Sequence, residues 1–182
     1  MPTLQPSITK QGNGADFYLR SGNLPSQVLE YSLPSGTNGG AALGGGVFYA
    51  REMNTGYPAL DVNGNSSAIP GLSLNILVDG TQITFPAGTY SIQALVCGLM
   101  LTQQARLFDV TNNQVIATGL SVGAETRNNV APVYAEVTFL TPTVVEIQFC
   151  GDQAFGNQDY GQACSFAGSS EVYLQVIITK EA

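Results

Sequence analysis

Hydrophobic and polar residues alternate along several short runs in the second half of the chain. In residues 89–96 every second residue from Tyr90 to Val96 is apolar, and residues 133–139, 145–149 and 171–179 repeat this pattern. A period of two places one set of side chains on one face of a β-strand. The core residues predicted from these faces are Tyr90, Ile92, Val137, Phe139, Ile147, Leu174 and Val176.

Turn-forming residues separate these runs. They occupy residues 79–80, 86–88, 112–113, 128–129 and 141–143, and are mostly Gly, Pro, Asn and Asp. No stretch shows a sustained helical period in its apolar residues. Strands at spacings of about 8–12 residues therefore predict an all-β sandwich or barrel.

The N-terminal residues 1–46 have a different composition, with nine of the 21 glycines and four of the nine prolines. Because glycine loses the most backbone entropy on ordering, this stretch is predicted to be an extended arm or linker, and residues 47–182 the folded domain. Two apolar patches, residues 17–19 and 28–31, are suited to packing on a neighbour. A disordered tail is the alternative interpretation, and both stay open.

The reverse faces of the predicted strands are less polar than expected for a face in water. Leu95 lies opposite the core set of its run, and Tyr173 and Ile177 lie opposite that of the last run. These three residues are predicted to lie in a subunit interface. The alternative is that they are scattered surface apolar residues of no special significance.

Charge is scarce in this chain, at 10% of residues against about 25% in ordinary soluble proteins. With 13 acidic and 6 basic residues the net charge is −7, which predicts no nucleic-acid partner. The chain has no histidine, so it has no Ser-His-Asp relay and no imidazole ligand for a metal or haem. We therefore expect no cofactor and no enzymatic activity, and a binding or structural module instead.

Targeting segments and cysteine spacing indicate the cellular environment of the chain. Residues 1–6 lack the features of a secretory signal peptide, and the apolar run 95–101 is too short to cross a bilayer, so no membrane insertion is expected. The three cysteines, Cys97, Cys150 and Cys164, match no zinc or redox spacing. Cys150 and Cys164 are either bridged or reduced, and both interpretations stay open.

Three local motifs resemble sites with known chemistry. Residues 119–123 match G-x-S-x-G, but Ser121 has no histidine base. Glu136 and Glu146 provide two carboxylates for glycoside hydrolysis, although such alternating acids are typical of a solvated strand face. Residues 61–65 begin like an EF-hand loop without its glycine or its final acid, which leaves only a looser calcium site open.

Six segments follow one another in order along the chain: residues 50–56, 85–94, 104–112, 115–119, 145–150 and 171–176. The most distinctive is residues 85–94, with the sequence Phe-Pro-Ala-Gly-Thr-Tyr-Ser-Ile-Gln-Ala. Together the segments resemble the C1q/TNF-like jelly-roll domain of phage and large-virus virion proteins. Residues 1–46 match no part of that domain, and residues 97–103 and 151–169 depart from its pattern.

The resemblance implies a jelly-roll sandwich of about ten strands that assembles as a homotrimer. It implies a non-enzymatic virion protein that decorates a capsid or forms the head of a fibre or tail appendage. Such a protein would be made in the host cytoplasm and exposed on the particle, with residues 1–46 anchored to a capsid or tail protein.

Loops 54–70, 97–103 and 151–169 would contact a host-surface glycan or protein. The candidate contact residues are Leu99, Met100, Phe155, Tyr160 and Phe166. The alternative hypothesis is a cellular carbohydrate- or protein-binding jelly roll that is not part of a virus.

Overall fold

The computed structural model of the protein describes residues 26–41, 46–53, 74, 76–99, 101–123, 128–152, 156–165 and 169–181. Over these residues the regular structure is β-strand, in two antiparallel sheets. The first sheet has the order β1 (Ser26–Leu33), β11 (Glu171–Lys180), β5 (Gly88–Gly98) and β9 (Asn129–Phe139). The second has the order β3 (Leu77–Asp79), β4 (Gln82–Phe85), β10 (Thr143–Gly151), β6 (Thr102–Asp109) and β7 (Gln114–Thr118). The short strands β2 (Tyr49–Ala50) and β8 (Val122–Gly123) pair with β10 and β6.

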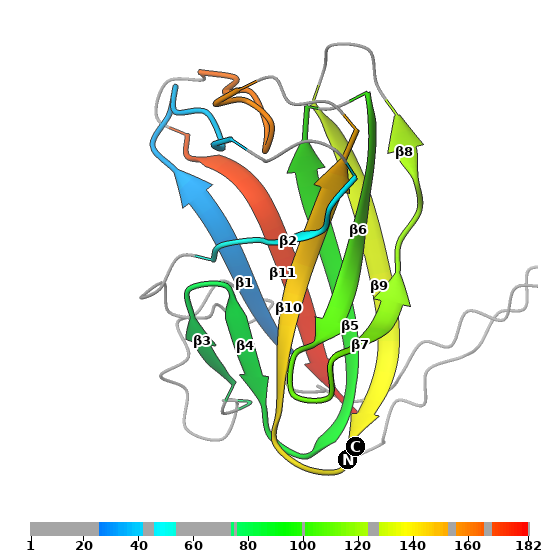
Figure 1. The fold of residues 1–182 in the computed structure, drawn as a ribbon. Helices are drawn as coiled ribbons and strands as arrows, with labels where there is room; N and C mark the ends of the chain where they lie inside the picture. The colour runs from blue at the N-terminus through cyan, green and yellow to red at the C-terminus, as the bar shows by residue number, and fades with distance from the viewer. Residues whose placement is uncertain are drawn as a thin grey trace, which may run out of the picture.

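The chain crosses repeatedly between the two sheets, which lie face to face in Figure 1. From β4 in the second sheet it passes to β5 in the first, and then to β6 and β7 in the second. It continues to β9 in the first sheet, β10 in the second and β11 in the first. This path is a jelly roll, and its 11 strands confirm the predicted all-β sandwich.

The core between the sheets is built from the alternating faces that the sequence predicts. Fully buried residues on these faces are Tyr90, Ile92, Ala94 and Val96 of β5 and Val145, Ile147 and Phe149 of β10. Val137 is only partly buried, but it packs against this core. Near one end of the sandwich the rings of Phe85 and Tyr90 lie 5.1 Å apart and those of Phe85 and Phe139 5.3 Å apart.

The folded domain begins earlier than predicted, because residues 26–33 form β1 of the first sheet. β1 pairs with β11 from Ser26, opposite Thr179, to Leu33, opposite Glu171. Leu29 is 7% exposed and belongs to the core. The predicted arm boundary at residue 46 is therefore wrong, because the apolar patch at residues 28–31 packs in its own chain. Residues 1–25 lie outside the described residues.

β11 departs from simple alternation at Tyr173. Tyr31 of β1 pairs with Leu174, but the next residue, Ser32, pairs with Val172. Tyr173 is thus an extra residue on β11, which makes it a β-bulge. Val172, which the alternation of residues 171–179 places on the core face, is consequently 46% exposed, whereas Tyr173 is 2% exposed.

The two ends of the sandwich differ. Ser26 lies opposite Thr179 at one end, whereas residues 34–41 and 156–165 lie together at the other end (Figure 1). The Gly39 N–H donates to the Gly161 carbonyl over 2.9 Å, and the Tyr160 N–H donates to the Gly40 carbonyl over 3.1 Å. We call residues 34–41 and 156–165 together the loop cap.

Candidate functional site

The outward surface of the first sheet carries few charges, and we call it the outer sheet face. Its side chains form rows across the four strands, one of which holds Val28, Ile177, Gln93 and Tyr134. The next row holds Glu30, Gln175, Leu95 and Pro132, and Glu30 accepts a hydrogen bond from Gln175 over 2.9 Å. Glu30 is the only side chain in these two rows that is charged at neutral pH.

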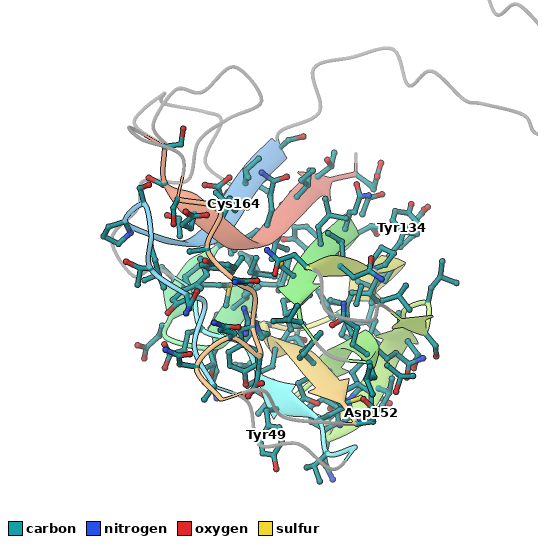
Figure 2. All side chains as sticks on the ribbon, turned by 90° about the horizontal axis from the view of Figure 1, so that it is seen from above. Tyr49, Tyr134, Asp152 and Cys164 are labelled. Atoms are coloured by element: carbon teal, nitrogen blue, oxygen red, sulfur yellow. The ribbon has the colours of Figure 1, made fainter. Side chains whose placement is uncertain are left out.

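Two of the three predicted interface residues, Leu95 and Ile177, lie on the outer sheet face, where each is half-buried. Tyr134 is also on this face and is 61% exposed, and Figure 2 shows it projecting from the side of the first sheet. Tyr134 was not among the predicted interface residues, although its place opposite the core set of residues 133–139 could have indicated it.

Tyr173 is not exposed for a subunit contact, because the β-bulge and the loop cap bury it in its own chain. Its hydroxyl donates to the Thr37 carbonyl over 2.7 Å. A Cβ at Gly161 would lie 2.5 Å from the Tyr173 ring, so the glycine allows the cap to pack closely on it. The interface role predicted for Tyr173 is therefore wrong.

Of the predicted contact residues of the loops, only Leu99 and Tyr160 lie among the described residues. Leu99 is 6% exposed, and its N–H donates to the Asp159 carbonyl over 2.9 Å, so the prediction of an exposed contact at Leu99 is wrong. Tyr160 is half-buried, with its ring turned to the interior. Met100, Phe155, Phe166 and the loop 54–70 lie outside the described residues.

Arg51 is a buried cation surrounded by aromatic rings, and it was not among the predicted site residues. It is 1% exposed, and its guanidinium carbon lies 3.6 Å from the ring centroid of Tyr160. The ring centroids of Tyr31 and Phe149 each lie 5.9 Å away. Burial lowers the pKa of Arg51 to about 10, an effect that Tyr160 partly opposes. The three rings stabilise the cation and join β1, β10 and the loop cap.

Glu171, the first residue of β11, fastens the loop cap to the sheet. Its Oε2 accepts the Cys164 N–H over 3.1 Å. Its Oε1 accepts the Gly36 N–H over 3.1 Å and the Ser165 N–H over 2.8 Å. These hydrogen bonds from Cys164, Gly36 and Ser165 lower the pKa of Glu171. One carboxylate thus holds both segments of the cap.

The carboxylates proposed for hydrolysis do not come together. Glu136 is on β9 of the first sheet, and Glu146 is on β10 of the second. Each alternates with residues that face the core between the sheets, so the two carboxylates lie on opposite outer surfaces. This arrangement does not provide the pair of facing carboxylates that glycoside hydrolysis requires.

The described residues form neither a metal-binding cluster nor a disulfide. Over the described residues, no group of three or more Cys, Asp or Glu is placed to hold a metal ion. Residues 61–65, the calcium-like segment, lie outside that part of the chain. The structure has Cys97, Cys150 and Cys164 as free thiols, so Cys150 and Cys164 are not bridged in it. Where the chain is described, it contains no helix with the length and apolarity to cross a membrane.

The fold and its surfaces define a jelly-roll protein with a weakly charged sheet face and a closed loop cap. No protein-family model matches the chain, and no curated protein matches it. Among solved structures, it is similar to murine APRIL in crystals at pH 8.5, with TM-score 0.42 and 8% identity over 85% of this chain and 98% of that chain. For murine APRIL at pH 8.0 the TM-score is 0.35 and the identity 9%, with the same coverage. Likenesses of this size carry no argument about function.

Proposed function

We propose that the protein is a non-enzymatic virion component, a homotrimer that decorates a capsid or forms the head of a fibre or tail appendage. The observation that carries this proposal is the outer sheet face, where exposed Tyr134 lies in the row of Ile177 and next to the row of Leu95, with few charges among them. The virion assignment is supported by the six ordered segments that resemble virion jelly rolls. The protein would be made in the host cytoplasm and exposed on the particle.

The chemistry of the outer sheet face suits association with copies of the same chain. Interface cores are depleted of charged residues and enriched in tyrosine. The two rows across this face contain one charged residue, Glu30, and its carboxylate already accepts a hydrogen bond from Gln175. A neighbouring subunit would therefore desolvate mostly apolar and amide side chains, at little electrostatic cost.

The placement of the two ends supports an anchoring end and an exposed end. The chain enters β1 at Ser26, at the end of the sandwich opposite the loop cap (Figure 1). We therefore assign anchoring on a capsid or tail protein to residues 1–25 and contact with a host surface to the capped end. This assignment shortens the predicted anchor from residues 1–46, because residues 26–33 belong to the sheet.

Light scattering on the protein as it elutes from a size-exclusion column tests the trimer directly. The expected mass is three times the chain mass of 19.1 kDa, and Tyr134→Glu is expected to reduce it to a single chain. The matched control is Leu77→Glu, which places the same charge at a site 69% exposed on the second sheet and is expected to leave the trimer intact. A wild-type mass of one chain would overturn the proposed assembly.

Particle incorporation tests the anchor. Removing residues 1–25 is expected to leave a folded trimer that is no longer incorporated into particles. Its sandwich should give the same far-ultraviolet circular dichroism as that of the full chain. If the shortened chain is incorporated as efficiently as the full chain, residues 1–25 are not the anchor.

A further inference from the structure

A groove opens where β6 begins and β10 ends, at the same end of the sandwich as the loop cap. Its volume is ≈ 450 Å³, and its walls include Gln103, Gln104, Ser121, Cys150 and Asp152. Pockets of roughly 300–1,000 Å³ hold small organic ligands. Figure 2 shows Asp152 on the side of the second sheet, away from Tyr134, so the groove is separate from the proposed subunit interface.

Two polar side chains in the groove are held in place by hydrogen bonds. Gln104 donates from Nε2 to the Gly119 carbonyl and to Ser121 Oγ, each over 3.0 Å. The Asp152 Oδ1 accepts the Thr102 N–H over 3.0 Å. Side chains fixed in this way lose little conformational entropy when a ligand binds, which favours recognition.

Gln103 also borders the groove, but its side chain lies on the opposite face of β6 from Gln104, in the core between the sheets. It is 2% exposed, and both Nε2 and Oε1 are buried without a hydrogen bond among the described residues. A Cβ at Gly98 would collide with this Oε1, so the glycine leaves room for the amide. Buried amides are normally satisfied. The Gln103 amide faces Gly98 of β5 between the two sheets, so it is not available to a molecule in the groove.

The composition of the groove limits the class of ligand. Among the described residues that line it there is no Lys or Arg, and Asp152 adds a negative charge, which disfavours phosphate, sulfate and acidic sugars. The described part of the lining has no large aliphatic or aromatic side chain, so it offers no pocket for a peptide side chain. An amide, a hydroxyl and a carboxylate complement groups that both donate and accept hydrogen bonds, as sugar hydroxyls do.

An aromatic surface lies one row along the same sheet. The groove includes the paired residues Gln104 and Cys150, and the next pair is Arg106 and Gln148. Phe48 stacks on Arg106, with the guanidinium carbon 4.0 Å from the ring centroid, and Arg106 donates to Gln148 over 2.8 Å. The apolar C–H face of a second sugar ring would pack on this surface.

We infer that this groove binds a neutral saccharide through Asp152 and Gln104. The inference rests on the proposed function, because it names the ligand class recognised at the exposed end of the molecule. It requires no bond to be made or broken, only hydrogen bonding and packing.

Thiol alkylation locates binding within the chain, because Cys150 lines the groove and exposed Cys164 does not. The full-length protein is treated with N-ethylmaleimide with or without methyl β-D-galactoside or methyl α-D-glucoside, and the alkylation of each cysteine is followed by mass spectrometry. One of these two probes is expected to slow the alkylation of Cys150 severalfold and to leave the rate at Cys164 unchanged. If neither probe protects Cys150, the inference is overturned.

Substitutions test the chemistry of recognition by titration calorimetry with the protecting probe. Asp152→Asn and Gln104→Leu are each expected to weaken binding by about tenfold, the effect of losing one good hydrogen bond to a fixed group. Asp79→Asn, which removes the same charge from the exposed β3–β4 turn, is the matched control and is expected to bind as the wild type. Circular dichroism shows that each variant is folded.

The remaining outcomes separate the two proposals. Unchanged binding by both folded groove variants, or tighter binding of a sulfated oligosaccharide than of the neutral probes, overturns the saccharide site. A trimer that binds neither probe overturns the site alone. A monomer whose Cys150 is protected overturns the assembly alone.

Discussion

Replacing Arg51 separates the contribution of its charge from that of its volume. We expect Arg51→Met to change the free energy of unfolding by less than about 1 kcal/mol, because the unbranched thioether fills a similar space among the rings. We expect Arg51→Ala to lower it by about 3 kcal/mol, because alanine leaves a cavity between Tyr31, Phe149 and Tyr160.

The magnitude follows from two opposing effects on the guanidinium. Burial lowers its pKa from 12.5 to about 10, which corresponds to roughly 3 kcal/mol against the charged form in the folded state. Stacking on Tyr160 at 3.6 Å in a desolvated site stabilises the cation by about 2 kcal/mol, and the two more distant rings add about 0.5 kcal/mol each. The effects nearly cancel, so removing the charge while keeping the volume should be close to neutral.

The assay is urea unfolding at neutral pH, followed by circular dichroism because the chain has no tryptophan. Protein concentration is held constant, since association raises the apparent stability. If Arg51→Met loses as much stability as Arg51→Ala, the charge itself stabilises the fold and the cancellation described above is incorrect.

Three further perturbations test the loop cap and its surroundings. Gly161→Ala should lower the free energy of unfolding by about 2 kcal/mol, because φ is +125° and the new Cβ meets the Tyr173 ring. Gly156→Ala, with φ +76° but open space around the new Cβ, should lower it by only about 1 kcal/mol. Urea unfolding measures both. Burial raises the pKa of Cys97 to about 11 and that of Tyr173 to about 12, so the free energy of unfolding should be full below pH 9.0 and fall as the pH approaches those values. Cys97→Ala should make this fall less steep, and an unchanged slope would contradict the assignment. The pKa of Glu171 is lowered from 4.5, so the stability from its hydrogen bonds to the cap should be full above that pH and be lost as the pH falls through the lower folded-state value. Hydrogen exchange at residues 34–41 and 156–165 should then accelerate in the wild type. In Glu171→Gln the same residues should already exchange faster at neutral pH.

Most of the fold could be predicted from the sequence, because alternation directly reports which strand face is buried. β5, β9 and β10 follow this rule, and their apolar sets are those found in the core. The rule fails at β11, where the bulge at Tyr173 shifts the alternation by one residue. A bulge depends on pairing with β1, which is distant in sequence, so local pattern gives no sign of it.

The surfaces were harder to predict, because they depend on which loops fold back over the strands. Leu99 is an apolar loop residue, which favoured an exposed contact, but its N–H is bonded to Asp159 of the returning chain. Arg51 looks like a surface arginine in the sequence, and only the convergence of three separated rings makes it a core residue. β1 was assigned to the arm because its neighbours are rich in glycine, whereas long-range pairing decides its structure.

The pairing of β1 with β11 also determines when the molecule can finish folding. The first described strand needs the last one as its partner, and Ser26 meets Thr179 across almost the whole described chain. During synthesis, β1 must wait until the C-terminal residues have left the ribosome, so closure of the first sheet is a late event. A chain that ends before residue 171 cannot pair β1 and leaves the edge of β5 open. Only complete chains thus present an intact first sheet, which excludes truncated products from any assembly built on that sheet.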